Sequence, residues 1–184
     1  MTAAPDDRQF RQPTVLRNGT PALIRVMRPD DRERLQAAFA KLDRSTIYTR
    51  FFSFRKELPE SALQRLADID FEHLAGLVAT VQVDGDEIVI GSATYVAAGD
   101  GAVEAEVAFT IEEDYQGQGL AGKLLAALAG LARRHGIERF TAEVLADNAA
   151  MLSVFRRSGL ALKQRREGGE FHVELDLGPA PAAG

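Results

Sequence analysis

Apolar and polar side chains alternate along residues 103–111. One face carries Val103, Ala105, Val107, Phe109 and Ile111, and the other carries Glu104, Glu106, Ala108 and Thr110. A period of two is typical of a half-buried strand. After a polar turn and a glycine-rich segment, leucines at positions 124, 125, 128 and 131 recur at helical spacing. The pattern therefore predicts a strand, a glycine-rich turn and a helix of about four to five turns.

The rest of the chain divides into short elements by the same criteria. Strands are predicted at 22–27, 74–83, 87–96, 139–145, 160–166 and 171–177, and helices after Asp30, over 45–52, after Pro59 and over 149–157. Asp30 and Glu33 have the spacing of a capping box. Asp84-Gly85 predicts a two-residue hairpin turn, and Gly91 predicts a bulge or a close approach within a strand.

The predicted order of elements is β-α-α-α-β-β-β-α-β-α-β-β. This order indicates one α/β (α+β) domain over residues 14–178, with a mixed, mostly antiparallel sheet flanked by helices and one parallel pair where the long helix crosses over. A chain of 184 residues is long enough to bury one core of this kind. We expect residues 1–13 and 179–184 to be flexible tails.

Composition removes several classes of function. The chain has no Cys, so disulfides, cysteine-ligated metals and a thiol nucleophile are excluded, and its three His are too far apart in sequence to predict a metal site. The net charge of −5 argues against a nucleic-acid partner, and no apolar segment is long enough to span a membrane. We expect a cytoplasmic protein, since no secretory signal is recognisable. The sequence leaves open whether it forms a homodimer.

The glycine-rich turn at 116–122 predicts a site for an anion. A strand that runs through glycines into a helix directs unpaired backbone N–H groups and a positive dipole end at one spot, which suits a phosphate or diphosphate. Residues 117–122 spell Gly-x-Gly-x-x-Gly, but no helix separates the three strands directly before them, as a dinucleotide-binding fold would require. No Walker-type loop is present. The same glycines could also do no more than shape a tight connection.

Three segments resemble, in order, the signatures of one family. Gln116-Gly117-Gln118-Gly119-Leu120-Ala121 is similar to the Gln/Arg-x-x-Gly-x-Gly/Ala motif of the GNAT superfamily of acyl-CoA-dependent N-acyltransferases. Residues 146–160 resemble its second signature, in which an Asn begins a helix and a Gly ends it. Residues 24–31 look like the family's first strand and the cap of its first helix. The resemblance covers residues 20–178 and implies the GNAT fold.

The resemblance also implies acetyl-CoA as co-substrate and suggests where it binds. Backbone groups of Phe109, Thr110 and Ile111 would pair with the pantetheine arm and donate to the thioester oxygen. Asn148 and Ser153 would serve the pantetheine and leaving-group side, although Asn148 could equally be a plain N-cap. The loop and first helical turn would hold the diphosphate, through Gln116, Gly117, Gln118, Gly119, Leu120, Ala121, Gly122 and Lys123.

Acyl transfer to an amine also needs a group that removes a proton. Holding a lysine side chain neutral at neutral pH costs about 4–5 kcal/mol, so a nearby carboxylate base is expected. The resemblance places Glu106 in this role, with Glu104 on the same face as the reserve; both could instead be solvated positions on a half-exposed strand. Many family members carry a Tyr seven residues after the Asn, which protonates the departing thiolate. Phe155 occupies that position here, so the thiolate leaves unaided, or Ser153, Tyr115 or a water protonates it.

A finer resemblance concerns the amine acceptor. Residues 28–31 and 45–52 are similar to the acetyltransferase domain of bacterial Pat-type protein lysine acetyltransferases, which also lack the Tyr. Acidic residues at 104, 106 and 112–114 would attract a cationic amine. Three hypotheses follow: a protein lysine acetyltransferase that works by direct attack in a ternary complex, an acetyltransferase for a small amine (a polyamine, an amino acid or a drug), and a non-catalytic acyl-CoA-sensing domain.

Overall fold

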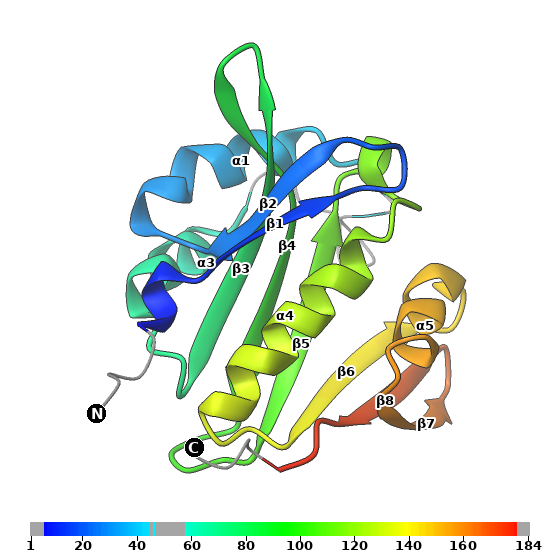
Figure 1. Ribbon diagram of the computed structural model, residues 1–184. Helices are drawn as coiled ribbons and strands as arrows, with labels where there is room; N and C mark the ends of the chain where they lie inside the picture. The colour runs from blue at the N-terminus through cyan, green and yellow to red at the C-terminus, as the bar shows by residue number, and fades with distance from the viewer. Residues whose placement is uncertain (1–5, 45, 47–57, 180–184) are drawn as a thin grey trace.

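An eight-stranded sheet forms the centre of the molecule, in the computed structural model that describes residues 6–44, 46 and 58–179 (Figure 1). The strand order is β1-β2-β3-β4-β5-β6-β8-β7, and only β5 and β6 are parallel. The strands are β1 (Arg11–Val15), β2 (Pro21–Val26), β3 (Leu74–Val83), β4 (Asp86–Ala97), β5 (Glu104–Ile111), β6 (Arg139–Leu145), β7 (Ala161–Glu167) and β8 (Glu170–Asp176). The predicted fold class and the single parallel pair are confirmed.

Helices cover the two faces of this sheet. The long helix α4 (Leu120–Arg134) lies across one face with α5 (Ala149–Arg156) beside it, whereas α1 (Arg32–Ala40) and α3 (Glu60–Gln64) lie on the other side of β3 and β4 (Figure 1). Short 3₁₀ turns occur at Asp7–Gln9, Pro29–Asp31, Arg65–Asp68 and Glu113–Tyr115. The helix expected over 45–52 lies outside the described residues. In the part of the chain that is described, no helix has the length and apolar character needed to cross a bilayer.

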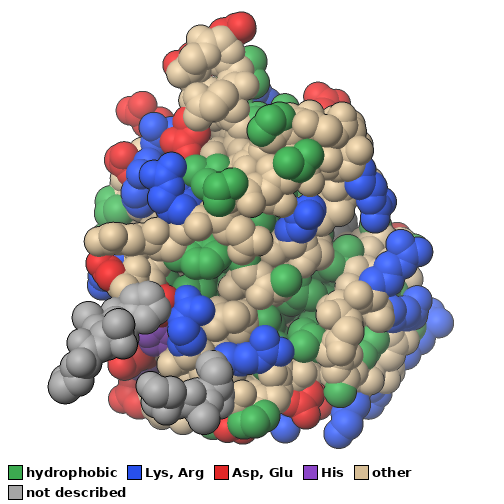
Figure 2. Space-filling view, viewed as in Figure 1, with side chains coloured by type: hydrophobic (Ala, Val, Ile, Leu, Met, Phe, Trp, Pro, Cys, Tyr) green, Lys and Arg blue, Asp and Glu red, His purple; other side chains and the backbone are tan. Residues whose placement is uncertain are grey.

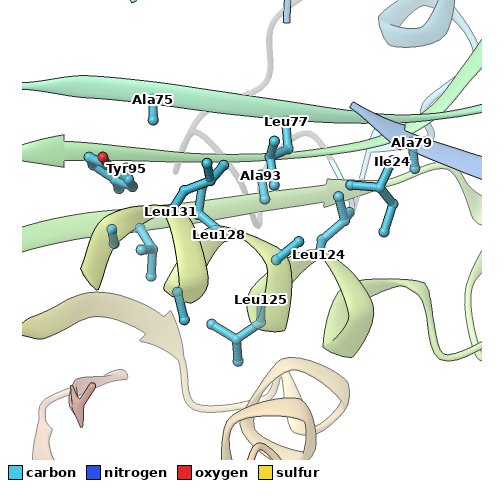
Figure 3. Close-up of a cluster of buried hydrophobic side chains, with 14 of the residues drawn as sticks. Ile24, Ala75, Leu77, Ala79, Ala93, Tyr95, Leu124, Leu125, Leu128 and Leu131 are labelled. Carbon is cyan, nitrogen blue, oxygen red and sulfur yellow. The ribbon is translucent and has the colours of Figure 1, made fainter. Parts of the chain in front are cut away.

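The apolar stripe of α4 packs against the middle of the sheet. Its four predicted leucines, at positions 124, 125, 128 and 131, are all buried. Leu124, Leu128 and Leu131 lie beside side chains of β2, β3 and β4, whereas Leu125 points to the other side of the helix (Figure 3). Several of the facing strand residues are small, among them Ala75, Ala79 and Ala93, so the helix can approach the strands closely. Burying one leucine side chain is worth about 1.5–3 kcal/mol, so this contact holds α4 firmly against the sheet.

The N-terminal residues are more ordered than their sequence indicates. β1 pairs with β2 from Arg11 to Val15, so the sheet starts at Arg11, three residues before the position where the domain was expected to begin. The carboxylate of Asp7 lies 2.5 Å from Arg134 Nη2 and 2.7 Å from His135 Nε2, at the end of α4. Because β1 is a polar edge strand that carries a proline, it has no apolar period that the sequence could reveal.

A buried ion pair, and not the predicted capping box, fixes the start of the first helix. Asp31 accepts hydrogen bonds from the backbone N–H of Arg28 (2.8 Å) and from Arg25 Nη1 and Nη2 (2.8 and 2.7 Å), so the predicted pairing of Asp30 with Glu33 is wrong. Arg25 and Asp31 are only 3% and 0% exposed. Burial by itself would raise the pKa of Asp31, but the hydrogen bonds from Arg25 and Arg28 outweigh it and lower that pKa below its ordinary value.

Two predicted backbone features of β3 and β4 are confirmed. Asp84 and Gly85 have positive φ angles of 51° and 88°, as a two-residue hairpin turn requires. The register of β3 with β4 shifts between Ala79 and Thr80, which are opposite Gly91 and Val89, so β4 carries a bulge next to Gly91. A Cβ atom at Gly91 would lie 3.2 Å from the carbonyl oxygen of Thr110, so this glycine also permits a close approach of β4 to β5.

Candidate active site

The strand β5 is paired along one edge and largely free along the other. On the β4 side the pairing runs over seven residues, from Ala105 opposite Ala97 to Ile111 opposite Gly91. On the β6 side it covers only 104–106, opposite 139–141, and it ends at the pair of Glu106 and Thr141. The backbone of β5 beyond Glu106 therefore has an edge with no strand neighbour among the described residues. The predicted pantetheine-binding residues Phe109, Thr110 and Ile111 lie on this segment.

The two candidate bases have different surroundings. Glu106 is solvent-exposed and makes no ion pair with any residue that the structure describes. The carboxylate of Glu104, two positions earlier on the same face, lies 3.0 Å from Arg139 Nη1 on β6. Arg139 thus occupies one oxygen of Glu104, whereas the carboxylate of Glu106 is left open to an incoming amine. The geometry therefore favours Glu106 over Glu104 as the base.

The loop between β5 and α4 presents a row of free backbone N–H groups. Gly117 and Gly119 have φ angles of +73° and +82°, which favour glycine, and Gly119 is the N-cap of α4. No acceptor for the N–H groups of residues 118–122 is found among the residues described here. The N–H of Lys123 donates to the carbonyl of Gly119 (3.2 Å), because Lys123 begins the regular hydrogen bonding of the helix. The amides of residues 118–122 are therefore free to donate to an anion, whereas that of Lys123 is already engaged.

Side chains of this loop mainly shape it. Gln116 Nε2 donates to the carbonyl of Ile111 (3.0 Å), and Leu120 is buried in the core. Ala121 is partly buried on the first turn of α4, and Gly122 is exposed there. The side chain of Gln118 accepts a hydrogen bond from the backbone of the β1–β2 turn, a neighbour that sequence reasoning missed because it lies 100 residues away in the chain.

Helix α5 bears the residues expected on the leaving-group side. Asn148 is its N-cap, with Oδ1 accepting from the N–H of Met151 (3.1 Å), so the N-cap interpretation is confirmed and the amide nitrogen Nδ2 stays available. Phe155 is 1% exposed and packs edge-on against Phe109, with ring centroids 6.0 Å apart. Ser153 is only partly buried on the same helix. Phe155 therefore offers no proton donor and instead holds α5 against the open segment of β5.

A largely apolar cavity of about 130 Å³ lies under α1 and α3, on the face of β4 and β5 that is turned away from α4. Its polar lining includes Ser92, Thr94, Thr110 and Glu112. By strand alternation, Thr110 and Glu106 lie on the same face of β5. Partial burial, followed by the nearby carboxylate of Asp114, raises the pKa of Glu112. The face that carries Glu106 thus continues into a cavity with a carboxylate at one end.

Charge is unevenly distributed around the site. Lys and Arg side chains gather along the side of the molecule formed by α5 and the β7–β8 hairpin (Figure 2). They include the exposed residues Arg156, Arg157, Lys163, Arg165 and Arg166. Acidic residues 112–114 lie at the other end, between β5 and the glycine loop. An anionic ligand on the α5 side and a cationic ligand on the acidic side would each approach charge of opposite sign.

Comparison with known proteins identifies the family. Residues 22–161 match the family model of the acetyltransferase (GNAT) domain. The chain belongs to the GNAT family. It is similar to Acetyltransferase Pat from Mycolicibacterium smegmatis, with 36% identity over 167 residues, which are 91% of this chain and 49% of that protein. The chain thus spans about half the length of that curated relative.

Two solved structures share the fold. The GNAT domain of S. lividans PAT gives a TM-score of 0.81 at 34% identity, over 95% of this chain and 99% of that one. The structure of YncA from Salmonella typhimurium with its cofactor acetyl-CoA gives 0.68 at 20% identity, over 88% and 99%. This GNAT protein thus belongs to a family of acyltransferases that use acetyl-CoA. No three His, Asp or Glu among its described residues are arranged to hold a metal ion.

Proposed function

We propose that this GNAT domain transfers the acetyl group of acetyl-CoA to the amine of a protein lysine, by direct attack in a ternary complex. The observation that carries the proposal is the release of β5 from β6 directly after Glu106, beside the row of free amides at 118–122. A thioester arm along the open edge of β5 would have its diphosphate at those amides. Its carbonyl would then lie near the exposed carboxylate of Glu106.

The chemistry assigned to these groups balances without a metal or an acyl-enzyme. The lysine nitrogen attacks the thioester carbonyl carbon, and its proton passes to Glu106 directly or through one water. A backbone N–H of the segment 109–111 donates to the oxygen as negative charge develops on it. The carbon–sulfur bond then breaks, the acetyl group stays on the lysine, and coenzyme A leaves as a thiolate. Since Phe155 cannot protonate that thiolate, we assign its later protonation to water.

The choice of a protein lysine draws on two further observations. The M. smegmatis and S. lividans relatives are Pat acetyltransferases, and both align with more than nine tenths of this chain. The acidic residues at 112–114 and the carboxylate of Glu106 provide a negative surface for a cationic side chain. A lysine on a folded partner needs only to extend its side chain to the exposed face of β5, which fits the exposure of Glu106.

A small amine is the second candidate, and the cavity under α1 and α3 favours it. A volume of about 130 Å³ would take the hydrocarbon part of a short amine, with Glu112 at its polar end. The two candidate acceptors would bind to different parts of the molecule. A small amine would use the cavity, whereas a protein acceptor would use the outer surface.

The decisive assay measures the release of free coenzyme A thiol with two sets of acceptors. One set is a panel of polyamines, amino acids and aminoglycosides. The other set consists of purified proteins whose lysines are acetylated only in cells that contain this protein. We expect turnover on protein lysines to exceed turnover on every small amine. A substitution that fills the cavity, Ala62→Leu, is the matched control. The Ala62→Leu variant should acetylate proteins as fast as the wild type does. If the variant loses protein acetylation, and if the wild type turns over small amines fast, a protein lysine is not the acceptor.

A further inference from the structure

The β1–β2 turn lies directly against the glycine loop, although the two segments are 100 residues apart in the chain (Figure 1). Three hydrogen bonds join them. The backbone N–H of Arg17 donates to the carbonyl of Gln118 (3.3 Å), and Arg17 Nη1 donates to the carbonyl of Gly117 (3.1 Å). The N–H of Asn18 donates to Gln118 Oε1 (3.0 Å). Both carbonyls at the centre of the loop are therefore directed toward the β1–β2 turn.

The direction of those carbonyls decides the direction of the neighbouring amides. In a trans peptide the C=O of one residue and the N–H of the next point in opposite directions, and the structure contains no cis peptide in its described part. The N–H groups of Gln118 and Gly119 therefore point away from the β1–β2 turn. These two amides begin the row of free N–H groups that continues into the first turn of α4.

The turn is itself firmly held, so it can act as a support. Leu16 is buried, and its N–H donates to the carbonyl of Thr20 (2.9 Å) while its own carbonyl accepts from the N–H of Gly19 (2.9 Å). The N–H of Thr20 also donates to Asn18 Oδ1 (3.0 Å). The exposed guanidinium of Arg17 is the charged group of this turn, and its Nε lies 3.8 Å from the position of a Cβ atom at Gly119.

We propose that the β1–β2 turn is a supporting part of the coenzyme site, with Arg17 as a positioning residue for the diphosphate-binding loop. Arg17 holds the carbonyls of 117 and 118 away from the ligand, so the amides of Gln118 and Gly119 are set in place before acetyl-CoA arrives. Its guanidinium also adds positive charge beside the loop. The proposal deepens the function proposed above and depends on it, since it assumes that the loop holds the diphosphate of coenzyme A.

The test replaces Arg17 and compares binding with chemistry. Arg17→Met removes the guanidinium that donates to the Gly117 carbonyl, together with its charge, and keeps the backbone N–H that donates to the Gln118 carbonyl. The side-chain length changes little, and we expect the Kd and KM for acetyl-CoA to rise about tenfold, the effect of losing one charge-assisted hydrogen bond. The kcat and the KM for the amine should stay unchanged. Arg17→Lys keeps the charge and one donor and should recover part of the affinity. Arg11→Met, an exposed arginine on β1 away from the loop, is the control and should leave binding unchanged.

Calorimetry with coenzyme A and with dephospho-coenzyme A, which lacks the 3′-phosphate, separates the outcomes. If Arg17 acts on the diphosphate loop, Arg17→Met weakens both ligands by the same factor. A loss confined to the 3′-phosphorylated ligand, an unchanged Kd, or a fall in kcat with an unchanged KM would each overturn the inference. Wild-type protein that gives no heat with acetyl-CoA would instead overturn the proposed function, so the two failures are distinguishable.

Discussion

The two edges of β5 show how one strand can be both a structural element and a binding surface. Toward β4 it is paired over seven residues, and toward β6 over three. The β4 edge is set by a short connection at 98–103 and by the close contact at Gly91, so its register has little freedom. The β6 edge depends on a crossover through the whole of α4, and the pairing of the two strands ends at Glu106. The free backbone groups that result are the ones a linear ligand can pair with.

The largest loss of activity should follow from replacing Glu106, the carboxylate at the point where β5 separates from β6. Glu106→Gln keeps the size of the side chain and removes the proton acceptor, so we expect kcat to fall by about 10²-fold or more with the Kd for acetyl-CoA nearly unchanged. Steady-state kinetics and calorimetry measure the two quantities. Glu104→Gln, which loses only an exposed ion pair with Arg139, should change kcat by less than about fivefold. Equal losses in both variants would remove the distinction between the two glutamates.

The paired edge can be disturbed at Gly91, which lies opposite Ile111. In Gly91→Ala the new methyl group would meet Ile111 Cδ1 at 2.9 Å and Leu120 Cδ2 at 3.2 Å, in addition to the Thr110 carbonyl. We expect a loss of about 1–3 kcal/mol in the free energy of unfolding, measured by urea denaturation. Gly99→Ala, in the β4–β5 connection, meets nothing within 4 Å and should be close to neutral. If Gly91→Ala is as stable as the wild type, the side chains around Gly91 can move aside to make room for the methyl group.

A smaller effect is expected at the loop that continues the free edge. Gly119→Ala forces a left-handed φ on a residue with a side chain, at a cost of about 1–2 kcal/mol, and shifts the N–H groups at the start of α4. We expect acetyl-CoA to bind about fivefold or more weakly and the protein to melt at a lower temperature. Gly130→Ala, inside the same helix with open space around it, should instead raise the melting temperature. Tight binding by Gly119→Ala would show that the αL conformation is dispensable.

The smallest expected effect is a change in stability with pH, from His73 beside the connection between β4 and β5. His73 lies with Nδ1 2.7 Å from Asp70 Oδ2 and Nε2 2.7 Å from Asp100 Oδ1, and hydrogen bonds to Asp70 and then Asp100 raise its pKa. A raised pKa stabilises the fold below the unfolded value of about 6.5, and this contribution is lost as pH rises through the folded pKa. His73→Gln should therefore be less stable than wild type at about pH 5.5 and equal to it at about pH 8.5. Thermal melts at the two pH values measure this, and a difference of the opposite sign would contradict it.

The elements that could be read from the sequence are those whose own residues carry a period. The leucines of α4, the alternation along β5 and the Asp84-Gly85 turn each depend on neighbours within a few positions, and all three are confirmed. The polar strand β1 has no such period and was missed. The cap at Asp31 was missed as well, because its main partner, Arg25, lies on the neighbouring strand β2.

The sequence by itself determined the family and the order of elements, and it placed a glutamate before a glycine loop that opens a helix. The family follows from the resemblance of three segments to known signatures, and the elements follow from local spacing, which the chain carries whatever its tertiary contacts. Only the tertiary structure decided that β5 leaves β6 at Glu106, that Arg139 holds Glu104, and that the β1–β2 turn supports the loop at 117–118. Each of these depends on segments distant in the chain, whose relative register is set by the packing of α4 and the pairing of strands, and no local pattern records it.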